Sequence, residues 1–321
     1  MTLSRIARAA VARRVSLLAA ALALAASSVS AQQVADSSFA PPVGPPAFPD
    51  GRGPRVALDE AHHNFHTLDG RYYTFGQLLA DDGYDVVPLR EPFGEAALQR
   101  VDVLVVANAL SEDDVEEWAL PNPSAFTPQE VRAVRRWVES GGGLLLIADH
   151  MPFPGAAQDL AAAFGFTLLN GFAMPVDSGA ARLPMVFRRS DGSLADHPTT
   201  RGGSPGRQVD SVATFTGEAL QVPSGAISLL TFPDGTTSLN PDTAWVFHED
   251  THRTDVSGWS QGAVLEVGRG RVAVFGEAAM FSAQLAGPQR VPMGMNAPVA
   301  ARNPAFLLNL VRWLSGEGDG R

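Results

Sequence analysis

The ten residues from Gly141 to His150 read GGGLLLIADH, and they give the clearest indication of the architecture. The three glycines end a helix and turn the chain, and an apolar run then follows over residues 144–148 without interruption. Such a run is typical of a parallel strand covered on both faces. Asp149 and His150 come where this strand ends, and sheets of this kind bind ligands at the carboxyl ends of their strands.

Predicted helices and strands also alternate in the segments before and after this strand. Thr127, Pro128 and Glu130 predict a helix start with a capping box, and residues 155–164 predict another helix. Further strands are expected over 55–58, 84–89, 101–108 and 166–169, with a helix over 74–81. This order predicts an α/β fold that is flavodoxin-like and doubly wound, with a mostly parallel sheet and helices on both faces.

The second half of the chain is expected to be antiparallel and rich in turns. Gly268, Arg269 and Gly270 predict a hairpin into a strand over 271–275, and Asn303 to Leu314 predicts a closing helix. The other candidate strands are 212–215, 226–232, 244–248 and 262–267. We therefore expect one α/β domain over residues 54–316, followed by a short tail over 317–321.

The N-terminus has the layout of a cleavable secretory signal. Arg5, Arg8, Arg13 and Arg14 precede an apolar run over about 15–26, and small residues then lead to Ala31. We expect a signal peptide over 1–31, a proline-rich extended linker over 32–53, and a periplasmic or secreted location. The apolar run is short for a bilayer, and no later segment predicts a membrane span.

Composition excludes several classes of chemistry. The formal net charge of −10 argues against nucleic acid as a partner. The chain has no Cys, and all 24 basic residues are Arg because no Lys is present. Disulfides, thiolate ligands, Cys nucleophiles, Schiff-base lysines and a P-loop lysine are therefore absent.

Polar residues gather after three predicted strands, at 59–66, at 149–150 and at Glu277. His62 and His66 are four apart, a spacing that on a helix lets two imidazoles chelate one metal. With Asp149 they are the predicted ligands of one divalent metal, for which zinc is the candidate; His150 or Glu277 could replace Asp149. The metal-free alternative is acid–base catalysis by a His that Asp59 or Asp149 orients, and a structural role is the third interpretation.

The site prediction names two groups of residues. The candidate catalytic residues are His62, His63, Asp149, His150 and Glu277. The candidate substrate contacts are Asp59, Glu60, Asn64, Ser282, Gln284 and Asn296. His197 is interpreted as structural, and His248 and His252 as residues of a solvated loop. Residues 290–296 are expected to form a loop that could cover the pocket.

The segments Gly141–His150 and Gly270–Glu277 resemble the class I glutamine amidotransferase-like superfamily, in particular an exported branch and, more distantly, ThuA-like proteins. The resemblance covers about residues 54–316 and implies the same α/β fold. Amidotransferases of this superfamily use a Cys nucleophile at a strand-to-helix elbow. Asp149 and His150 occupy about that place here, so the sequence excludes Cys-dependent glutaminase chemistry.

These observations predict a hydrolase, metal-dependent or using His and Asp as acid and base, that acts on a small polar substrate. A carbohydrate is the substrate that the resemblance and the location imply. The alternatives are a non-catalytic ligand-binding or scaffold domain of the cell envelope, or an accessory domain of a separate enzyme.

Overall fold

The computed structural model describes residues 33–42, 44–177, 180–181, 183–203 and 205–316. The predicted signal peptide and the C-terminal tail lie outside these residues. Within them, no helix combines the length and the apolar character that crossing a membrane would need.

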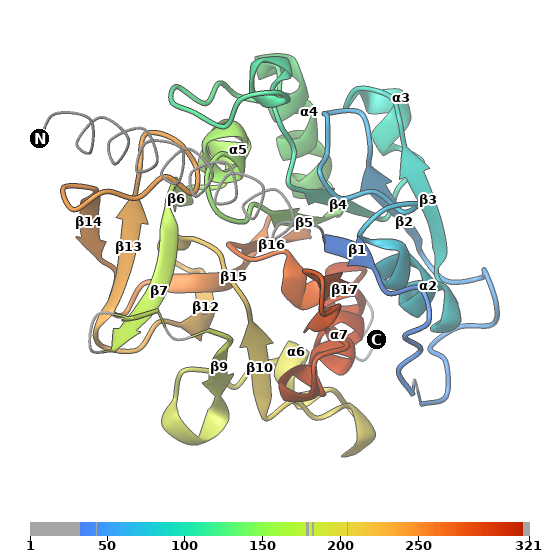
Figure 1. The fold of residues 1–321 in the computed structure, drawn as a ribbon. Coiled ribbons are helices and arrows are strands. Elements are labelled where there is room, and N and C mark those ends of the chain that lie inside the picture. The colour runs from blue at the N-terminus through green and yellow to red at the C-terminus, as the bar shows by residue number, and fades with distance from the viewer. Residues whose placement is uncertain (1–32, 43, 178–179, 182, 204, 317–321) are drawn as a thin grey trace, which may run out of the picture.

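A nine-stranded sheet forms the centre of the described chain (Figure 1). Five neighbouring strands are parallel, in the order β3, β2, β4, β5 and β16. Their bounds are Asp85–Leu89, Arg55–Asp59, Val103–Ala107, Gly143–Ile147 and Gly270–Phe275. The sheet continues antiparallel through β15 (Ser260–Val267), β11 (Ala219–Gln221) and β6 (Thr167–Leu169), and β12 (Ile227–Thr231) also pairs with β15. The predicted fold class is confirmed.

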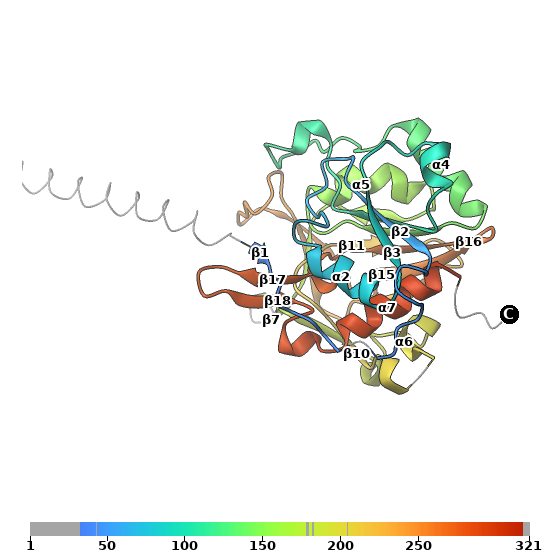
Figure 2. The same ribbon diagram turned by 90° about the vertical axis from the view of Figure 1, so that its right-hand side faces the viewer.

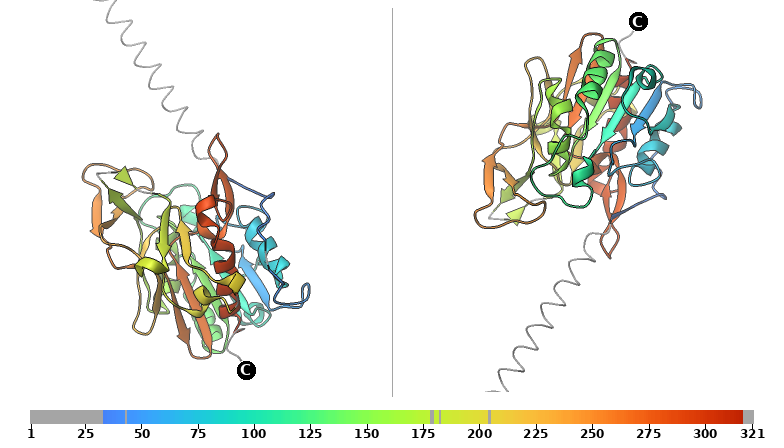
Figure 3. Two further views of the ribbon diagram at one scale, coloured as in Figure 1. Left: turned by 90° about the horizontal axis from the view of Figure 1, so that it is seen from below. Right: turned by 90° about the horizontal axis from the view of Figure 1, so that it is seen from above.

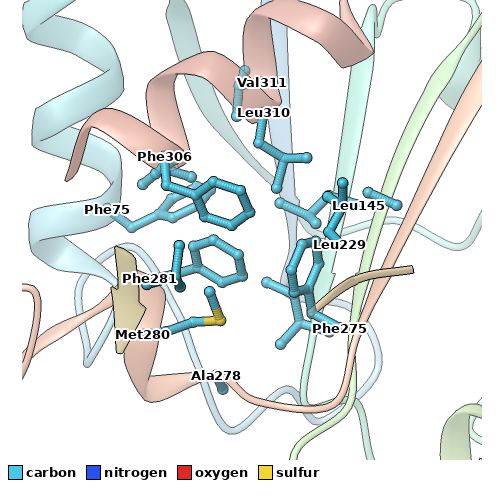
Figure 4. Close-up of a cluster of buried hydrophobic side chains, with 14 of the residues drawn as sticks. Phe75, Leu145, Leu229, Phe275, Ala278, Met280, Phe281, Phe306, Leu310 and Val311 are labelled. Carbon is cyan, nitrogen blue, oxygen red and sulfur yellow. The ribbon is translucent and has the colours of Figure 1, made fainter. Parts of the chain in front are cut away.

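Helices cover both faces of this sheet (Figure 2). One core layer contains residues of α2 (Tyr73–Asp81) and α7 (Asn303–Leu314), and the other contains residues of α3 (Glu95–Leu98), α4 (Pro128–Glu139) and α5 (Phe153–Ala162). Leu145 belongs to the first layer and Leu146 to the second, because successive side chains of a strand point to opposite faces. Figure 4 shows Leu145 with Phe275 and Phe306 in the first layer.

The second half adds smaller units around the central sheet. A four-stranded sheet lies on the side away from β2 and β3 (Figures 1 and 3) and contains β14 (His252–Asp255), β13 (Thr236–Asn240), β7 (Phe172–Asp177) and β8 (Ala180–Ala181). The remaining strands are β9 (Met185–Arg188), β10 (Ser211–Thr214), β1 (Gln33–Ala35), β17 (Ala283–Ala286) and β18 (Val291–Gly294). The short helices are η1 (Glu112–Asp114), η2 (Arg189–Asp191), α6 (Pro198–Arg201), η3 (Pro205–Arg207), η4 (Ala279–Phe281) and η5 (Pro298–Ala300).

Several predicted local structures are confirmed. The Thr127 hydroxyl accepts a hydrogen bond from the Glu130 N–H at 3.3 Å, and a Glu130 carboxylate oxygen accepts one from the Thr127 N–H at 2.9 Å. This capping box begins α4 as predicted. The hairpin between β15 and β16 is also confirmed, since Val267 pairs with Gly270.

Other predictions differ from the structure. Residues 244–248 do not form a strand, because the chain turns at Trp245, whose φ is 67°. Residues 61–66 do not form a helix, so the helical spacing of His62 and His66 does not apply to them. Within the predicted linker, β1 pairs with β17 and the Phe48 ring packs against Tyr84.

Candidate functional site

Four neighbouring parallel strands end in polar residues at one edge of the sheet. Asp59 ends β2, Asn108 follows β4, Asp149 follows β5 and Glu277 follows β16. The pairing of Ile147 with both neighbouring strands places these ends side by side. The Asp149 N–H donates a hydrogen bond to the Asn108 side-chain oxygen at 2.9 Å. The structure thus brings the three predicted polar segments to a common edge.

His62 lies between two carboxylates. Its Nδ1 is 2.9 Å from Asp59 Oδ1 and its Nε2 is 2.9 Å from Glu130 Oε1. Its ring also packs against Phe93 and Phe126. Burial opposes the charged form, but the hydrogen bonds and charges of Asp59 and Glu130 outweigh it and raise the pKa of His62. We interpret His62 as an imidazolium that ties the end of β2 to the start of α4.

His66 is buried against an aromatic ring, unlike His62, which lies between two carboxylates. It is 3% exposed, its ring stacks on Tyr72 at 4.6 Å, and its Nδ1 has no hydrogen-bond partner among the described residues. Burial lowers its pKa to about 3, with smaller contributions from the charges of Arg71 and His150. His66 is therefore a neutral imidazole near neutral pH.

Arg71 carries a second unsatisfied atom beside His66. Its Nε is buried without a hydrogen-bond partner in the described chain, and its guanidinium lies 4.0 Å from the centre of the Phe65 ring. Burial lowers the pKa of Arg71. Sequence reasoning missed this residue, although its place five positions after His66 was an available signal.

The ring of His150 packs against aromatic side chains. Its ring stacks on Phe172 at 4.7 Å and meets the Trp245 ring edge-on at 4.6 Å. Its Nδ1 is 2.7 Å from the Met151 carbonyl oxygen, which can only accept. The Nδ1 therefore carries a proton, and Nε2 is the acceptor of the neutral ring.

Asp149, Glu277 and Glu218 are buried carboxyl groups that interact electrostatically with one another through Asp149. Burial raises the pKa of Asp149, and burial together with the charge of Asp149 raises the pKa of Glu277 and of Glu218. Glu277 accepts hydrogen bonds from the N–H groups of Ala279 and Met280 at 3.0 and 2.7 Å. Sequence reasoning missed Glu218, because its segment shows no polar strand-end pattern.

The other predicted residues occupy varied positions. Glu60 accepts from the Leu68 N–H, the Asn64 amide donates to Asp59, and His63 is exposed with a φ of 46°. The predicted contacts after Glu277 bond to one another: Gln284 in β17 donates to the Ser282 hydroxyl at 2.7 Å, and Asn296, after β18, donates to the Gln284 carbonyl oxygen at 2.9 Å.

His62, one of the three predicted zinc ligands, is already hydrogen-bonded at both ring nitrogens. Both ring nitrogens of His62 already contact carboxylates, so ligation would break two charge-assisted hydrogen bonds. Among the described residues, no three His, Asp or Glu side chains are grouped so that they could hold a metal ion. The metal stays a prediction.

The fold has known counterparts among solved structures. No protein-family model matches the chain, and no curated protein matches it significantly. The mmIFT52 N-terminal domain aligns with a TM-score of 0.58 at 14% identity, over 83% of this chain and 99% of that domain. This likeness shows a shared fold.

Two further solved structures align more loosely, and both are ThuA-like proteins. The one from Bacteroides uniformis ATCC 8492 has a TM-score of 0.44 at 13% identity, over 86% of this chain and 94% of that one. The one from Parabacteroides merdae ATCC 43184 has a TM-score of 0.45 at 12% identity, over 84% of this chain and 93% of that one.

Proposed function

We propose that the protein binds a small polar substrate at the carboxyl edge of the sheet and hydrolyses it by acid–base catalysis. The observation that carries this proposal is the pair of unsatisfied atoms at His66 Nδ1 and Arg71 Nε. A buried polar atom without a partner costs about 1–3 kcal/mol. Eight buried side-chain atoms of the described residues lack one, and this pair is distinguished by the electrostatic interaction of His66 with Arg71 and His150. An oxygen-rich substrate would accept from the guanidinium and bond to the neutral imidazole.

Asp149 and His150 are suited to the two proton transfers of hydrolysis. The raised pKa of Asp149 keeps a proton on this carboxyl group to higher pH, as a general acid needs. Nε2 of His150 can take a proton from water, whose oxygen then bonds to the reacting carbon of the substrate. Asp149 gives its proton to the leaving oxygen as the carbon–oxygen bond breaks. Burial, together with the charge of Asp149, raises the pKa of Glu277 as well.

Export to the periplasm or beyond, which the N-terminal sequence predicts, would place this reaction outside the cytoplasm. A substrate for such an enzyme would come from the cell surface or the medium. Fusing residues 1–31 to a reporter that is active only after export tests this part of the proposal.

The Asp149→Asn variant tests the reaction. It retains the shape of the carboxyl group but cannot act as an acid, so turnover should fall about 10²–10⁴-fold. The assay is hydrolysis of a panel of chromogenic glycosides and esters, with Asp234→Asn at an exposed turn as the matched control. Melting temperatures of both variants report whether the fold is intact.

Wild-type protein that turns over no substrate of the panel but binds one of them would favour the non-catalytic interpretation. Full activity in Asp149→Asn would overturn the proposed acid. Elemental analysis of the purified protein tests the zinc prediction separately, with His66→Ala as the variant that should lose any stoichiometric metal.

A further inference from the structure

A pocket of about 320 Å³ lies beside the four-stranded sheet, at the loop that joins β13 to β14. This volume falls within the range of about 300–1,000 Å³ that is usual for small-molecule sites. Its polar lining comes from the two strand ends and from the loop between them. The polar lining residues are Asn240, Asp242, Thr243, His248, Asp250, Thr251 and His252, and Pro241 and Val246 complete the lining.

The walls of this pocket are held by hydrogen bonds. The Leu120 N–H donates to the Asp242 carbonyl oxygen at 2.8 Å, and the His248 N–H donates to the Thr251 hydroxyl at 2.7 Å. The amide of Asn240 lies 3.2 Å from His252 Nδ1. His248 and His252 are both exposed, as expected for a solvated loop, and both line this pocket.

The same loop exposes two aromatic rings next to the pocket. Trp245 is 51% exposed and Phe247 is 39% exposed, although both pack against Phe172. Trp245 holds a φ of 67°, a conformation that side-chain-bearing residues adopt at a cost. Because Trp245 also contacts His150, one residue links the pocket loop to the proposed catalytic edge.

A ligand for this surface must combine two kinds of chemistry. The pocket offers hydroxyl, amide, carboxylate and imidazole groups within a small volume, which suits a ligand with many hydroxyl groups along its edge. The rings of Trp245 and Phe247 offer flat apolar faces, which suit a ligand with C–H groups on its own face. A sugar ring has both features.

We propose that this pocket binds one sugar ring, and that Trp245 guides the neighbouring ring of the same oligosaccharide toward His150. The binding of a sugar by the pocket and the adjacent aromatic rings does not depend on the proposed function. The approach of the second ring to His150 rests on the proposed function, and it makes the substrate an oligosaccharide.

Isothermal titration calorimetry tests this proposal on the purified full chain. The probes are cellobiose, maltose, lactose, mannobiose and diacetylchitobiose, with spermidine and calcium chloride as probes of cation binding. Wild-type protein should bind at least one of the disaccharides. Asp242→Ala removes a side chain that lines the pocket, and Trp245→Ala removes the ring proposed to contact the second sugar. Each variant should therefore weaken that binding about tenfold or more.

The exposed-site variant Asp234→Asn is the matched control and should bind as the wild type does. The Asp149→Asn variant should keep disaccharide binding in the pocket even where it abolishes turnover, which separates this inference from the proposed function. Melting temperatures show whether each variant folds.

Three results would overturn the inference: no disaccharide binds, only spermidine or calcium binds, or Asp242→Ala and Trp245→Ala both bind like the wild type. Turnover of another substrate together with any of these results would leave the proposed function standing without the sugar pocket.

Discussion

Replacing His62 by phenylalanine should destabilise the protein through electrostatics alone. The variant keeps an aromatic ring against Phe93 and Phe126, whose ring centres lie 4.5 and 4.8 Å from that of His62. It removes the donors that face Asp59 and Glu130. The two carboxylates then lose the positive charge between them.

The size of this effect follows from the hydrogen bonds that are lost and kept. Each charge-assisted hydrogen bond contributes about 1.5–3 kcal/mol, and breaking a buried ion pair costs about 3–5 kcal/mol. Asp59 still accepts a hydrogen bond from the Ala61 N–H, and Glu130 still accepts hydrogen bonds from the N–H groups of Thr127 and Phe93. Neither carboxylate is therefore left without a hydrogen bond. We expect the free energy of unfolding to fall by about 3–5 kcal/mol.

The loss of stability in this variant should be larger at low pH than at high pH. The folded-state pKa of His62 is raised, so its contribution is complete below the unfolded pKa of about 6.5 and is lost as pH rises through the folded value. Burial opposes ionisation of Glu130, but hydrogen bonds from Thr127 and His62 outweigh it and lower its pKa to about 2, so this carboxylate stays charged throughout.

Urea denaturation followed by circular dichroism, at a series of pH values on both sides of the unfolded pKa, measures the difference between wild type and variant. The difference should be largest at the acidic end and should shrink as the solution becomes alkaline. A difference under about 1 kcal/mol, or one that is constant with pH, would refute the assignment of His62 as a charged link.

Three further perturbations test other parts of the structure. Asp82→Ala leaves two arginines without the buried carboxylate they share, and should lower the free energy of unfolding by about 3–5 kcal/mol in urea denaturation; a loss under about 1 kcal/mol would count against the pairing. Gly217→Ala places a Cβ 2.1 Å from the Gly276 carbonyl oxygen at a φ of 125°, and should lower the melting temperature clearly, whereas Gly235→Ala, which meets no neighbouring atom, should cost less. The His66 imidazole should stay neutral down to about pH 4 in nitrogen NMR, given its pKa of about 3; a midpoint near 6.5 would show that it is open to water.

The fold was predictable where hydrophobic periodicity and turn chemistry agree. The apolar run over 144–148 and the capping residues around Thr127 each specify one local structure, and the alternation of such segments specifies the parallel layers. The strand predicted over 244–248 was wrong because a buried strand and an exposed aromatic loop have similar apolar patterns in sequence. Only the turn at Trp245 distinguishes them.

The place of the polar segments at one sheet edge was also predictable, because strand ends are visible in the sequence. The orientation of each imidazole was not. His62 turns toward Glu130, which the sequence shows only as a helix-capping residue far along the chain. Glu218 likewise enters the acidic group directly before β11, whose pairing with β15 and β6 no local pattern specifies.

The pairing of β16 with β5 has a consequence for how the chain is made. On the ribosome, β2 to β5 emerge long before the strand that covers the open side of β5. Until residues 270–275 emerge, that side presents unpaired backbone groups and apolar side chains, to which a neighbouring nascent chain can add. Synthesis of this protein therefore passes through an interval in which a holding chaperone would be most useful.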